Sequence, residues 1–501
     1  MSPNPAKSPE NCIYVGGSWR PAHATARLDV INPATELLIG QVVDADAVDV
    51  DTAVRAARDA LKSTAWEHTT AQDRARMLHA LASELTARAS VMARTITCEN
   101  GSPIAETSGA APHAADFLRY TATLADSLDA DVRRFPAGGA TTSVRRVPAG
   151  VAALIAPWNF PLTLVMAKLA PALLAGCTVV VKPAPETPFH LAVLVEAIEA
   201  AHLPPGVVNV VTGGAGTGQL LVAHPNVDKI AFTGSTEAGR AIARECGALL
   251  RPVTLELGGK SAAVVLHDAD LDVFAAQLIR SCLRNTGQTC YAATRILAPR
   301  SSYSDVLDIV IETVRSAPLG DPFDPTTVFG PLVSARQRDR VEKYIRLGTA
   351  EGARITTGGN RPSHLDIGYY VEPTVFADVD RGMRIAREEI FGPVLTVLAY
   401  SDEDEAISIA NDSHYGLGGV VFSADDHRAA HFSQRLETGS VGINFFGSNQ
   451  AAPFGGWKQS GLGVELGPEG LSAYVKYQSL HRRTSPVEEM EPYLSDQGPA
   501  S

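Results

Sequence analysis

Residues 151–186 read VAALIAPWNFPLTLVMAKLAPALLAGCTVVVKPAPE, a run of apolar segments separated by short turns. The apolar residues of 151–156 and 178–183 predict two buried β-strands. Residues 162–176 are apolar with helical spacing, and Gly176 predicts the end of a helix. A strand, a helix and a second strand in this order predict two parallel strands joined by a helical crossover.

The same alternation continues along the chain. Further strand-like segments are 207–213, 229–234 and 252–257, and a helical segment covers 190–201. This pattern predicts an α/β fold in which helices cover both faces of a parallel sheet. Gly258 and Gly259 then predict a hinge to a second α/β region. Its expected strands are 262–266, 294–299 and 393–400, and its expected helices are 274–285 and 335–352.

The composition is that of a soluble globular protein with two or three domains. The chain has 501 residues, of which 45% are hydrophobic and 20% charged. A net charge of −12 argues against non-specific nucleic-acid binding. The six cysteines contain no CxxC pair, so we expect no disulfide framework and a cytoplasmic protein. The histidines form no HExxH pair, and we expect no metal site.

Neither a membrane span nor a signal peptide is expected. The uncharged run 147–167 contains three prolines, a glycine and an asparagine, which suit buried strand, loop and helix better than one apolar helix. The N-terminal stretch MSPNPAKSPENC is polar and proline-rich and lacks the apolar core of a signal peptide, and residues 1–18 are expected to form a tail. These residues and 481–501 are polar, and we expect loose tails at both ends.

Two turns of the first sheet could bind an anion. Residues 233–239, TGSTEAG, would expose backbone N–H groups at the start of a helix, although an ordinary strand-to-helix turn has the same pattern. Arg240 and Ala241 stand where a P-loop has lysine and serine or threonine, so an NTPase is disfavoured. Lys182 follows three valines at a strand end, where it either contacts a ribose or phosphate or is a solvated surface lysine.

Three residues have the chemistry of an acyl-transfer site. Cys290 ends the run NTGQTC, whose backbone N–H groups would lower the pKa of a nucleophilic thiol, unless it is a buried structural cysteine. Glu256 ends a strand before two glycines, where a partly buried carboxylate can act as a base; an exposed glutamate is the alternative. Asn159 in PWNFP could donate to an oxyanion, worth about 3–4 kcal/mol, or make a local turn bond.

Seven motifs in this order resemble the NAD(P)-dependent aldehyde dehydrogenase superfamily. They are PWNFP (157–161), VVVKP (179–183), FTGSTEAGR (232–240), LELGGK (255–260), NTGQTC (285–290), EEIFGPV (388–394) and PFGGWKQSGLGVELG (453–467). The resemblance extends from about residue 12 to about residue 480. It implies a two-lobed architecture with a Rossmann-like cofactor domain (19–130 and 148–257) and a catalytic α/β domain (258–471). A small β oligomerisation arm would combine 131–147 with 472–480.

The resemblance also implies roles for matched positions. Cys290 would attack an aldehyde to form a thiohemiacetal, Asn159 would hold the oxyanion, and Glu256 would activate water to hydrolyse the thioester. Lys168 and Glu465 match positions linked to proton relay, although Val464 stands where many members have arginine. The implied cofactor-binding residues are Pro157, Trp158, Lys182, Gly234, Ser235, Glu256, Gly258, Glu389 and Phe391.

One departure from the family concerns the cofactor. Members commonly place a glutamate three residues after the strand-end lysine, where it binds the adenosine ribose. Pro185 stands there in this chain, and Glu186 follows one residue later. Without that carboxylate a repulsion against a 2′-phosphate is lost. The expected cofactor is therefore NAD, with NADP left open.

The expected substrate is a small apolar or aromatic aldehyde. The positions expected to line its tunnel are Phe160, Leu164, Thr289, Tyr291 and Phe446. Arg284 could anchor a carboxylate, as in a semialdehyde dehydrogenase, but we expect it to face outward. The sequence also leaves open two other functions: a cysteine esterase or acyl-transfer enzyme, and a non-catalytic protein. The family resemblance further implies a homodimer or homotetramer.

Overall fold

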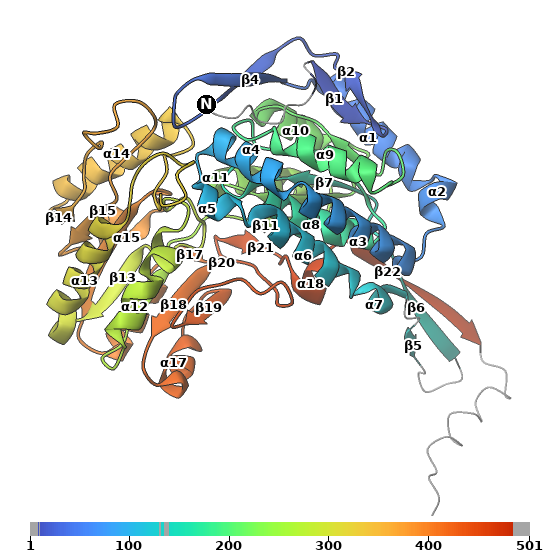
Figure 1. The fold of residues 1–501 in the computed structure, drawn as a ribbon. Helices are drawn as coiled ribbons and strands as arrows, with labels where there is room; N and C mark the ends of the chain where they lie inside the picture. Colours follow the sequence, from blue (N-terminus) through green and yellow to red (C-terminus); the bar gives the residue numbers. More distant parts are fainter. Residues whose placement is uncertain (1–8, 10, 130–131, 135–139, 484–501) are drawn as a thin grey trace, which may run out of the picture.

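The computed structural model describes residue 9 and residues 11–129, 132–134 and 140–483. Within them, two large β-sheets lie side by side, each covered by helices, and a narrow third sheet projects from the body (Figure 1). The predicted α/β architecture is confirmed. None of the helices in these ranges is long and apolar enough to span a lipid bilayer.

The first sheet has eight strands in the described chain, in the order β2-β1-β9-β8-β7-β10-β11-β21. Five parallel strands form its centre: β7 (Val151–Ile155), β8 (Thr178–Lys182), β9 (Val208–Val210), β10 (Lys229–Thr233) and β11 (Val253–Glu256). Antiparallel edges are added by β1 (Cys12–Val15) with β2 (Ser18–Pro21), and by β21 (Gly461–Leu462). Because β8 follows β7 on one side and β10 lies on its other side, the strand order reverses between β7 and β10.

Alternate residues of the central strands face opposite layers of helices. Ala152 and Leu154 pack in a core with α3 (Ala71–Ala87), α6 (Ala110–Ala122), α8 (Pro161–Leu174) and α9 (His190–Ala200). Val151, Ala153 and Ile155 pack in a second core with α1 (Ala47–Leu61), α10 (Ala215–Ala223) and α11 (Thr236–Ala248). This two-sided burial explains the uninterrupted apolar strands.

The second sheet has seven strands in the same described ranges, in the order β14-β15-β16-β13-β12-β18-β19. They are β12 (Ala262–Val265), β13 (Arg295–Pro299), β14 (Arg354–Thr357), β15 (Thr374–Ala377), β16 (Val394–Tyr400), β18 (Gly418–Phe422) and β19 (Ser440–Ile443). Its helices are α12 (Leu271–Leu278), α13 (Tyr303–Ser316), α14 (Ala335–Ala350), α16 (Glu403–Asn411) and α17 (Asp426–Ser433).

Shorter elements connect these layers. The helices are α2 (Thr64–Glu67), α4 (Ala89–Asn100), α5 (Ile104–Thr107), α7 (Ala125–Asp129), α15 (Arg384–Arg387) and α18 (Gly467–Ser472), with a π turn at Ile279–Leu283 and a 3-10 turn at Arg300–Ser302. Two-stranded sheets pair β3 (Arg27–Ile31) with β4 (Leu38–Val43) and β17 (Tyr415–Gly416) with β20 (Trp457–Lys458). The projecting sheet contains β5 (Val132–Arg134), β6 (Ala140–Pro148) and β22 (Val475–Arg483).

Three expectations about segments are corrected. The predicted tail 1–18 is wrong from residue 12, because Ile13, Tyr14 and Val15 are buried in β1. The predicted tail 481–501 begins too early, since β22 runs to Arg483. The predicted catalytic domain 258–471 is not continuous, because β21 within it pairs in the first sheet. Parts of these predictions lie outside the described residues. For the tails these parts are 1–8, 10 and 484–501, and for the arm they are 131 and 135–139.

The buried Glu99 ties α4 to the start of α9. It is 0% exposed, and its carboxylate accepts hydrogen bonds from the backbone N–H groups of Phe189 (2.7 Å) and His190 (3.2 Å). Nδ1 of His190 lies 3.1 Å from the same carboxylate. These N–H groups begin a helix and have no intrahelical acceptor.

We predict that Glu99→Ala lowers the free energy of unfolding by about 2–4 kcal/mol, because it leaves buried donors without an acceptor. Thermal and urea unfolding at neutral pH measure the loss. Glu84→Ala is the control, since Glu84 pairs with Arg88 on a partly exposed surface and its loss should cost less than about 1 kcal/mol. Equal losses in the two variants would show that Glu99 does not hold these helices together.

Candidate active site

A continuous groove crosses the first sheet at its switch point. It consists of a cavity of about 790 Å³ that includes Lys182 and a cavity of about 600 Å³ that includes Cys290. Both cavities are lined by Trp158, which follows β7, and by Gly234, which follows β10. The carboxyl ends of strands at a switch point are where parallel α/β sheets bind ligands.

The turn after β10 places a helix N-terminus on this groove. Ser235 is the N-cap of α11, and its Oγ accepts a hydrogen bond from the N–H of Ala238 at 3.3 Å. A side chain at Gly234 would come within 2.5 Å of the ring of Phe232. The first turn of α11 therefore presents backbone N–H groups to the groove, a favourable setting for a phosphate.

Lys182 lies at the other end of the groove. It is buried, and its Nζ donates to the carbonyl of Pro183 at 3.0 Å. Burial lowers the pKa of Lys182 to about 8, although the charges of Glu186 and Asp44 oppose the shift. The reading of Lys182 as a solvated surface lysine is therefore wrong.

The loop that carries Cys290 has an unusual backbone. After the π turn, Asn285 (φ 52°), Thr286 (φ 56°) and Gly287 (φ 71°) are all left-handed. A side chain at Gly287 would come within 2.2 Å of the carbonyl oxygen of Gly392, so only glycine fits. Consecutive left-handed residues are costly and need support from their surroundings.

Polar side chains of the loop supply that support. Asn285 Nδ2 donates to the carbonyl of Asn159 at 2.9 Å. The N–H of Gly330 donates to Thr286 Oγ1 at 3.0 Å, and the N–H of Val333 donates to Gln288 Oε1 at 3.0 Å. The polar run before the cysteine therefore fastens the loop to its neighbours.

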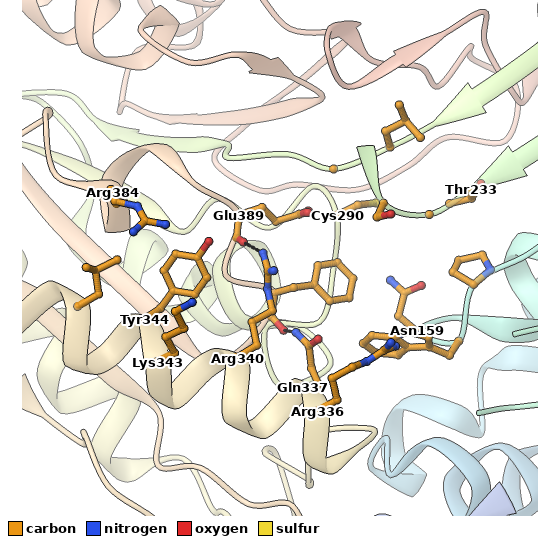
Figure 2. Close-up of a pocket in the computed structure, with 18 residues that line it drawn as sticks. Asn159, Thr233, Cys290, Arg336, Gln337, Arg340, Lys343, Tyr344, Arg384 and Glu389 are labelled. Carbon is orange, nitrogen blue, oxygen red and sulfur yellow. Dashed lines mark hydrogen bonds between the residues drawn. The ribbon is translucent and has the colours of Figure 1, made fainter. Parts of the chain in front are cut away.

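Asn159 joins the loop to the first sheet. Its side chain is buried, and Nδ2 donates to the carbonyl of Gln288 at 2.9 Å. One N–H of the amide remains for another acceptor. Asn159 lines both the 600 Å³ cavity and a second cavity of about 300 Å³ beyond the thiol. Figure 2 shows the Asn159 side chain directed across the groove toward Cys290, which lies in the turn before β13.

The thiol of Cys290 is less acidic than the sequence suggests. Burial raises its pKa to about 12, and the nearby charges of Glu389 and Glu256 contribute. Backbone N–H groups of Cys290 and Tyr291 lower the pKa, as expected, but the opposing effects are larger. The N–H groups indicated by the sequence are therefore present, but burial and the two carboxylates outweigh their effect on the thiol pKa.

Glu256 lies at the end of β11 among charged side chains. It is 3% exposed, and neither carboxylate oxygen has a hydrogen-bond partner among the described residues. Burial and the charge of Glu465 raise its pKa well above the usual value, while Lys168 opposes them. Lys168 Nζ lies 2.8 Å from Glu465 and donates to Thr233 Oγ1 at 2.6 Å. The fold thus brings Lys168 and Glu465 close to Glu256.

The segment EEIFGPV faces Trp158 across the groove. Glu389 Oε1 accepts a hydrogen bond from the N–H of Gly259 at 3.0 Å, and burial raises the pKa of Glu389 to about 7. A side chain at Gly258 would come within 2.5 Å of the same carboxylate. The ring of Phe391 meets that of Trp158 edge-on at 5.3 Å.

The 300 Å³ cavity beyond the thiol contains part of the expected substrate set. Phe160 and Phe446 line it, and Tyr291 stacks on Phe446 with ring centroids 4.7 Å apart. Leu164 is not among its lining residues, because the first turn of α8 presents residues 161–163 to the cavity. Thr289 is also absent, and its hydroxyl donates to the carbonyl of Arg284.

Comparisons with known proteins agree with this geometry. The aldehyde dehydrogenase family model matches residues 19–480. A geranial dehydrogenase of Castellaniella defragrans is 51% identical over 471 residues, which cover 94% of this chain and 98% of that protein. The chain belongs to the aldehyde dehydrogenase family.

Solved structures of the family have the same fold. An aldehyde dehydrogenase of Mycobacterium tuberculosis complexed with NAD+ matches with a TM-score of 0.92 at 42% identity, over 95% of this chain and 98% of that one. A betaine aldehyde dehydrogenase of Staphylococcus aureus in complex with NAD+ matches with a TM-score of 0.92 at 35% identity, over 95% of each chain. The protein is thus an aldehyde dehydrogenase that oxidises an aldehyde to the carboxylic acid.

Several groove residues of this aldehyde dehydrogenase were missed by the sequence analysis. They come from α14 and α15 and include Arg336, Gln337, Arg340, Lys343, Tyr344 and Arg384 (Figure 2). The helical spacing of 335–352, which carries all of them except Arg384, was visible in the sequence. Which face of that helix borders the groove depends on how the two sheets pack, which local sequence does not reveal.

We predict that Glu389→Gln makes the Cys290 thiol more reactive at pH 8. Glu389, with a pKa of about 7, is ionised at that pH, and its charge raises the thiol pKa, so its removal should increase the thiolate fraction. The expected gain in iodoacetamide alkylation rate, followed by mass spectrometry, is about threefold to tenfold.

Glu388→Gln is the matched control for this prediction. Glu388 accepts hydrogen bonds from Tyr344 and Arg384, both at 2.6 Å, and is not among the charges that shift the thiol pKa. This variant should alkylate at the wild-type rate. An equal rate in both variants would mean that the Glu389 charge does not act on the thiol.

Proposed function

We propose that Cys290 is the nucleophile, that Asn159 and the Cys290 N–H bind the oxyanion, and that Glu256 is the general base. The observation that carries this assignment is the position of Asn159. Its amide is fixed by the Gln288 carbonyl, and it borders the cavities on both sides of Cys290. A donor, a thiol and two cavities therefore meet at one point, as acyl chemistry requires.

The groove fits an extended dinucleotide. The support is its position at the switch point, the helix N-terminus at Ser235 and the buried Lys182 at one end. Two related enzymes are complexed with NAD+ in their structures. We propose NAD as the cofactor, held by Lys182, the Gly234–Ser235 turn, Glu389 and Phe391. When bound, its nicotinamide supplies the hydride acceptor.

The first half of the reaction follows from the thiol and the amide. Because its pKa is raised, Cys290 is protonated at neutral pH, and it releases its proton to solvent water in the groove as sulfur bonds to the aldehyde carbon. The new oxyanion accepts from the free N–H of Asn159 and from the Cys290 backbone. Oxidation of this thiohemiacetal leaves a thioester on Cys290.

The second half needs a base at the thioester. A buried carboxylate with a raised pKa is suited to take a proton from water, and Glu256 is followed by the flexible pair Gly258–Gly259. The Lys168–Glu465 pair beside it offers a path on which that proton can leave. Hydrolysis then releases the carboxylic acid.

The competing assignments are a semialdehyde dehydrogenase, an esterase and an acyl-transfer enzyme.

We propose that the substrate is an apolar aldehyde. The aromatic rings of Phe160 and Phe446 line the 300 Å³ cavity, Tyr291 stacks on Phe446 behind it, and these rings support this class. A relative of 51% identity is a geranial dehydrogenase, and geranial is an apolar, unsaturated aldehyde.

We propose that the enzyme forms a homodimer or homotetramer through its arm. In the projecting sheet β22 pairs with β6 on one side only, and Tyr477 and Leu480 on it are exposed. An exposed strand edge is suited to pair with a second copy. Light scattering in solution tests this proposal, and a monomer would contradict it.

We infer a cytoplasmic location. All six cysteines are free thiols, which fits a reducing compartment. Fractionation of cells that express the protein tests the inference.

We predict that Glu256→Gln forms the thioester and then stalls. With aldehyde and NAD it should release about one equivalent of NADH per site in a burst, because acylation needs Cys290 while hydrolysis needs the base. Mass spectrometry should then find the acyl group on Cys290. Cys290→Ala is the control, with no burst and no adduct. NADH production by Cys290→Ala would disprove the nucleophile, and full turnover by Glu256→Gln would disprove the base.

We predict that Glu186 and Arg336 change the cofactor preference in opposite directions. Both line the 790 Å³ cavity, and their side chains lie 3.4 Å apart. Glu186→Gln removes a charge that repels a 2′-phosphate, so the kcat/KM ratio of NADP to NAD should rise about threefold to tenfold. Arg336→Gln removes an attracting charge and should lower that ratio. Unchanged ratios in both variants would place the adenosine ribose elsewhere.

A further inference from the structure

Arg284 faces into the 300 Å³ cavity beyond the thiol. Its Nε lies 2.8 Å from Glu106 Oε1, and its Nη2 contacts the same oxygen. Its Nη1 donates to the hydroxyl of Tyr291 at 2.9 Å. The guanidinium also lies 5.0 Å from the ring centroid of Phe160. The expectation that Arg284 faces outward is therefore wrong.

The partner of Arg284 comes from a distant part of the chain. Glu106 belongs to α5, whereas Arg284 directly follows the π turn. The two side chains are only 29% and 35% exposed. Burial alone would lower the pKa of Arg284, but Tyr291 and Glu106 raise it above the usual value, so the guanidinium stays charged at neutral pH. Each of its three nitrogens already has a protein acceptor.

This pairing leaves little net charge in the cavity wall. His113 also lines the cavity, and burial together with the charge of Arg284 lowers its pKa, so it is neutral at pH 7. Arg280 lies at the exposed rim. The rest of the lining is uncharged and combines apolar residues such as Ile96 and Leu162 with polar ones such as Ser102 and Thr107. A carboxylate on a substrate meets an arginine that is already neutralised, and a substrate cation meets a glutamate that is already neutralised.

We propose that Glu106 and Arg284 are the specificity-determining pair of this site. Their charges cancel, which selects uncharged aldehydes, and either one left without the other would admit aldehydes of opposite charge. The pair also holds the Tyr291 hydroxyl, and through it the ring that stacks on Phe446. This inference rests on the proposed function, because it concerns the substrate of the same site.

The physical basis is the cost of leaving a partly buried charge without its partner. Removing one member of a partly buried ion pair leaves the other desolvated without a partner. A substrate of opposite charge that restores the pair then recovers much of this cost. Selectivity among aldehydes should therefore depend on which member of the pair is present.

The test uses three aldehydes of matched chain length. They are hexanal, its omega-carboxylated counterpart and its omega-trimethylammonium counterpart. Steady-state kcat/KM is measured with NAD for the wild-type enzyme, Glu106→Gln, Arg284→Gln and the double variant. His113→Gln is the control, because it alters the same wall without a change in charge at pH 7.

Wild-type enzyme should prefer hexanal to both charged aldehydes by about tenfold or more. Glu106→Gln should gain at least about tenfold in selectivity for the carboxylated aldehyde, and Arg284→Gln should gain as much for the trimethylammonium aldehyde. The gains should appear mainly in KM. The double variant and His113→Gln should keep the wild-type order.

Two results would overturn the proposal. One is a wild-type enzyme that prefers a charged aldehyde, a measurement that does not depend on any variant folding. The other is unchanged selectivity in soluble single variants that still oxidise hexanal. Failure of the wild-type enzyme to oxidise any of the three aldehydes would instead count against the proposed apolar substrate, so the two failures can be told apart.

Discussion

The hydrogen bond between the Asn159 amide and the Gln288 carbonyl fixes the loop that carries Cys290 against the first sheet. It is 2.9 Å long and is buried. A second bond of 2.9 Å runs in the opposite direction, from Asn285 Nδ2 to the backbone carbonyl of Asn159. One partner follows a strand of the first sheet, and the other belongs to the loop between α12 and β13 of the second lobe. Because the thiol follows Gln288 by two residues, its position relative to the groove depends on this reciprocal pair.

Local sequence was sufficient for elements whose evidence lies within a few residues. The parallel strands of 151–257 are buried on both faces and therefore have uninterrupted apolar segments that can be recognised. The same reasoning missed β1, because Cys12–Val15 is short and its burial comes from pairing with the distant β9. It also placed Arg284 on the surface, since the carboxylate that holds it comes from α5. The N–H groups around Cys290 were visible in sequence, but the burial and carboxylates that outweigh them are tertiary.

The groove is built at a cost to stability. Glu256 and Glu389 have raised pKa values, so the folded chain binds their protons more tightly than the unfolded chain does. Protonation of these two carboxyls therefore stabilises the folded state fully below the unfolded carboxyl pKa. This stabilisation is lost as pH rises through their pKa values in the folded state. Lys182 and Lys260 have pKa values lowered by burial to about 8 and about 7, which also opposes folding at neutral pH. The large apolar cores on the two faces of each sheet offset these terms.

Two ion pairs lie near the proposed reaction site, and they bear on which groups a bound carbonyl would meet. Lys168 and Glu465 pair near Glu256, and Glu106 and Arg284 pair in the wall of the 300 Å³ cavity. Each pair cancels its own charge at short range, so its field falls off steeply with distance. In the proposed mechanism the groups that face the aldehyde oxygen are the Asn159 amide and the Cys290 N–H, which are neutral donors. Such donors stabilise an oxyanion without binding a ground-state anion, and that difference is what accelerates the addition step.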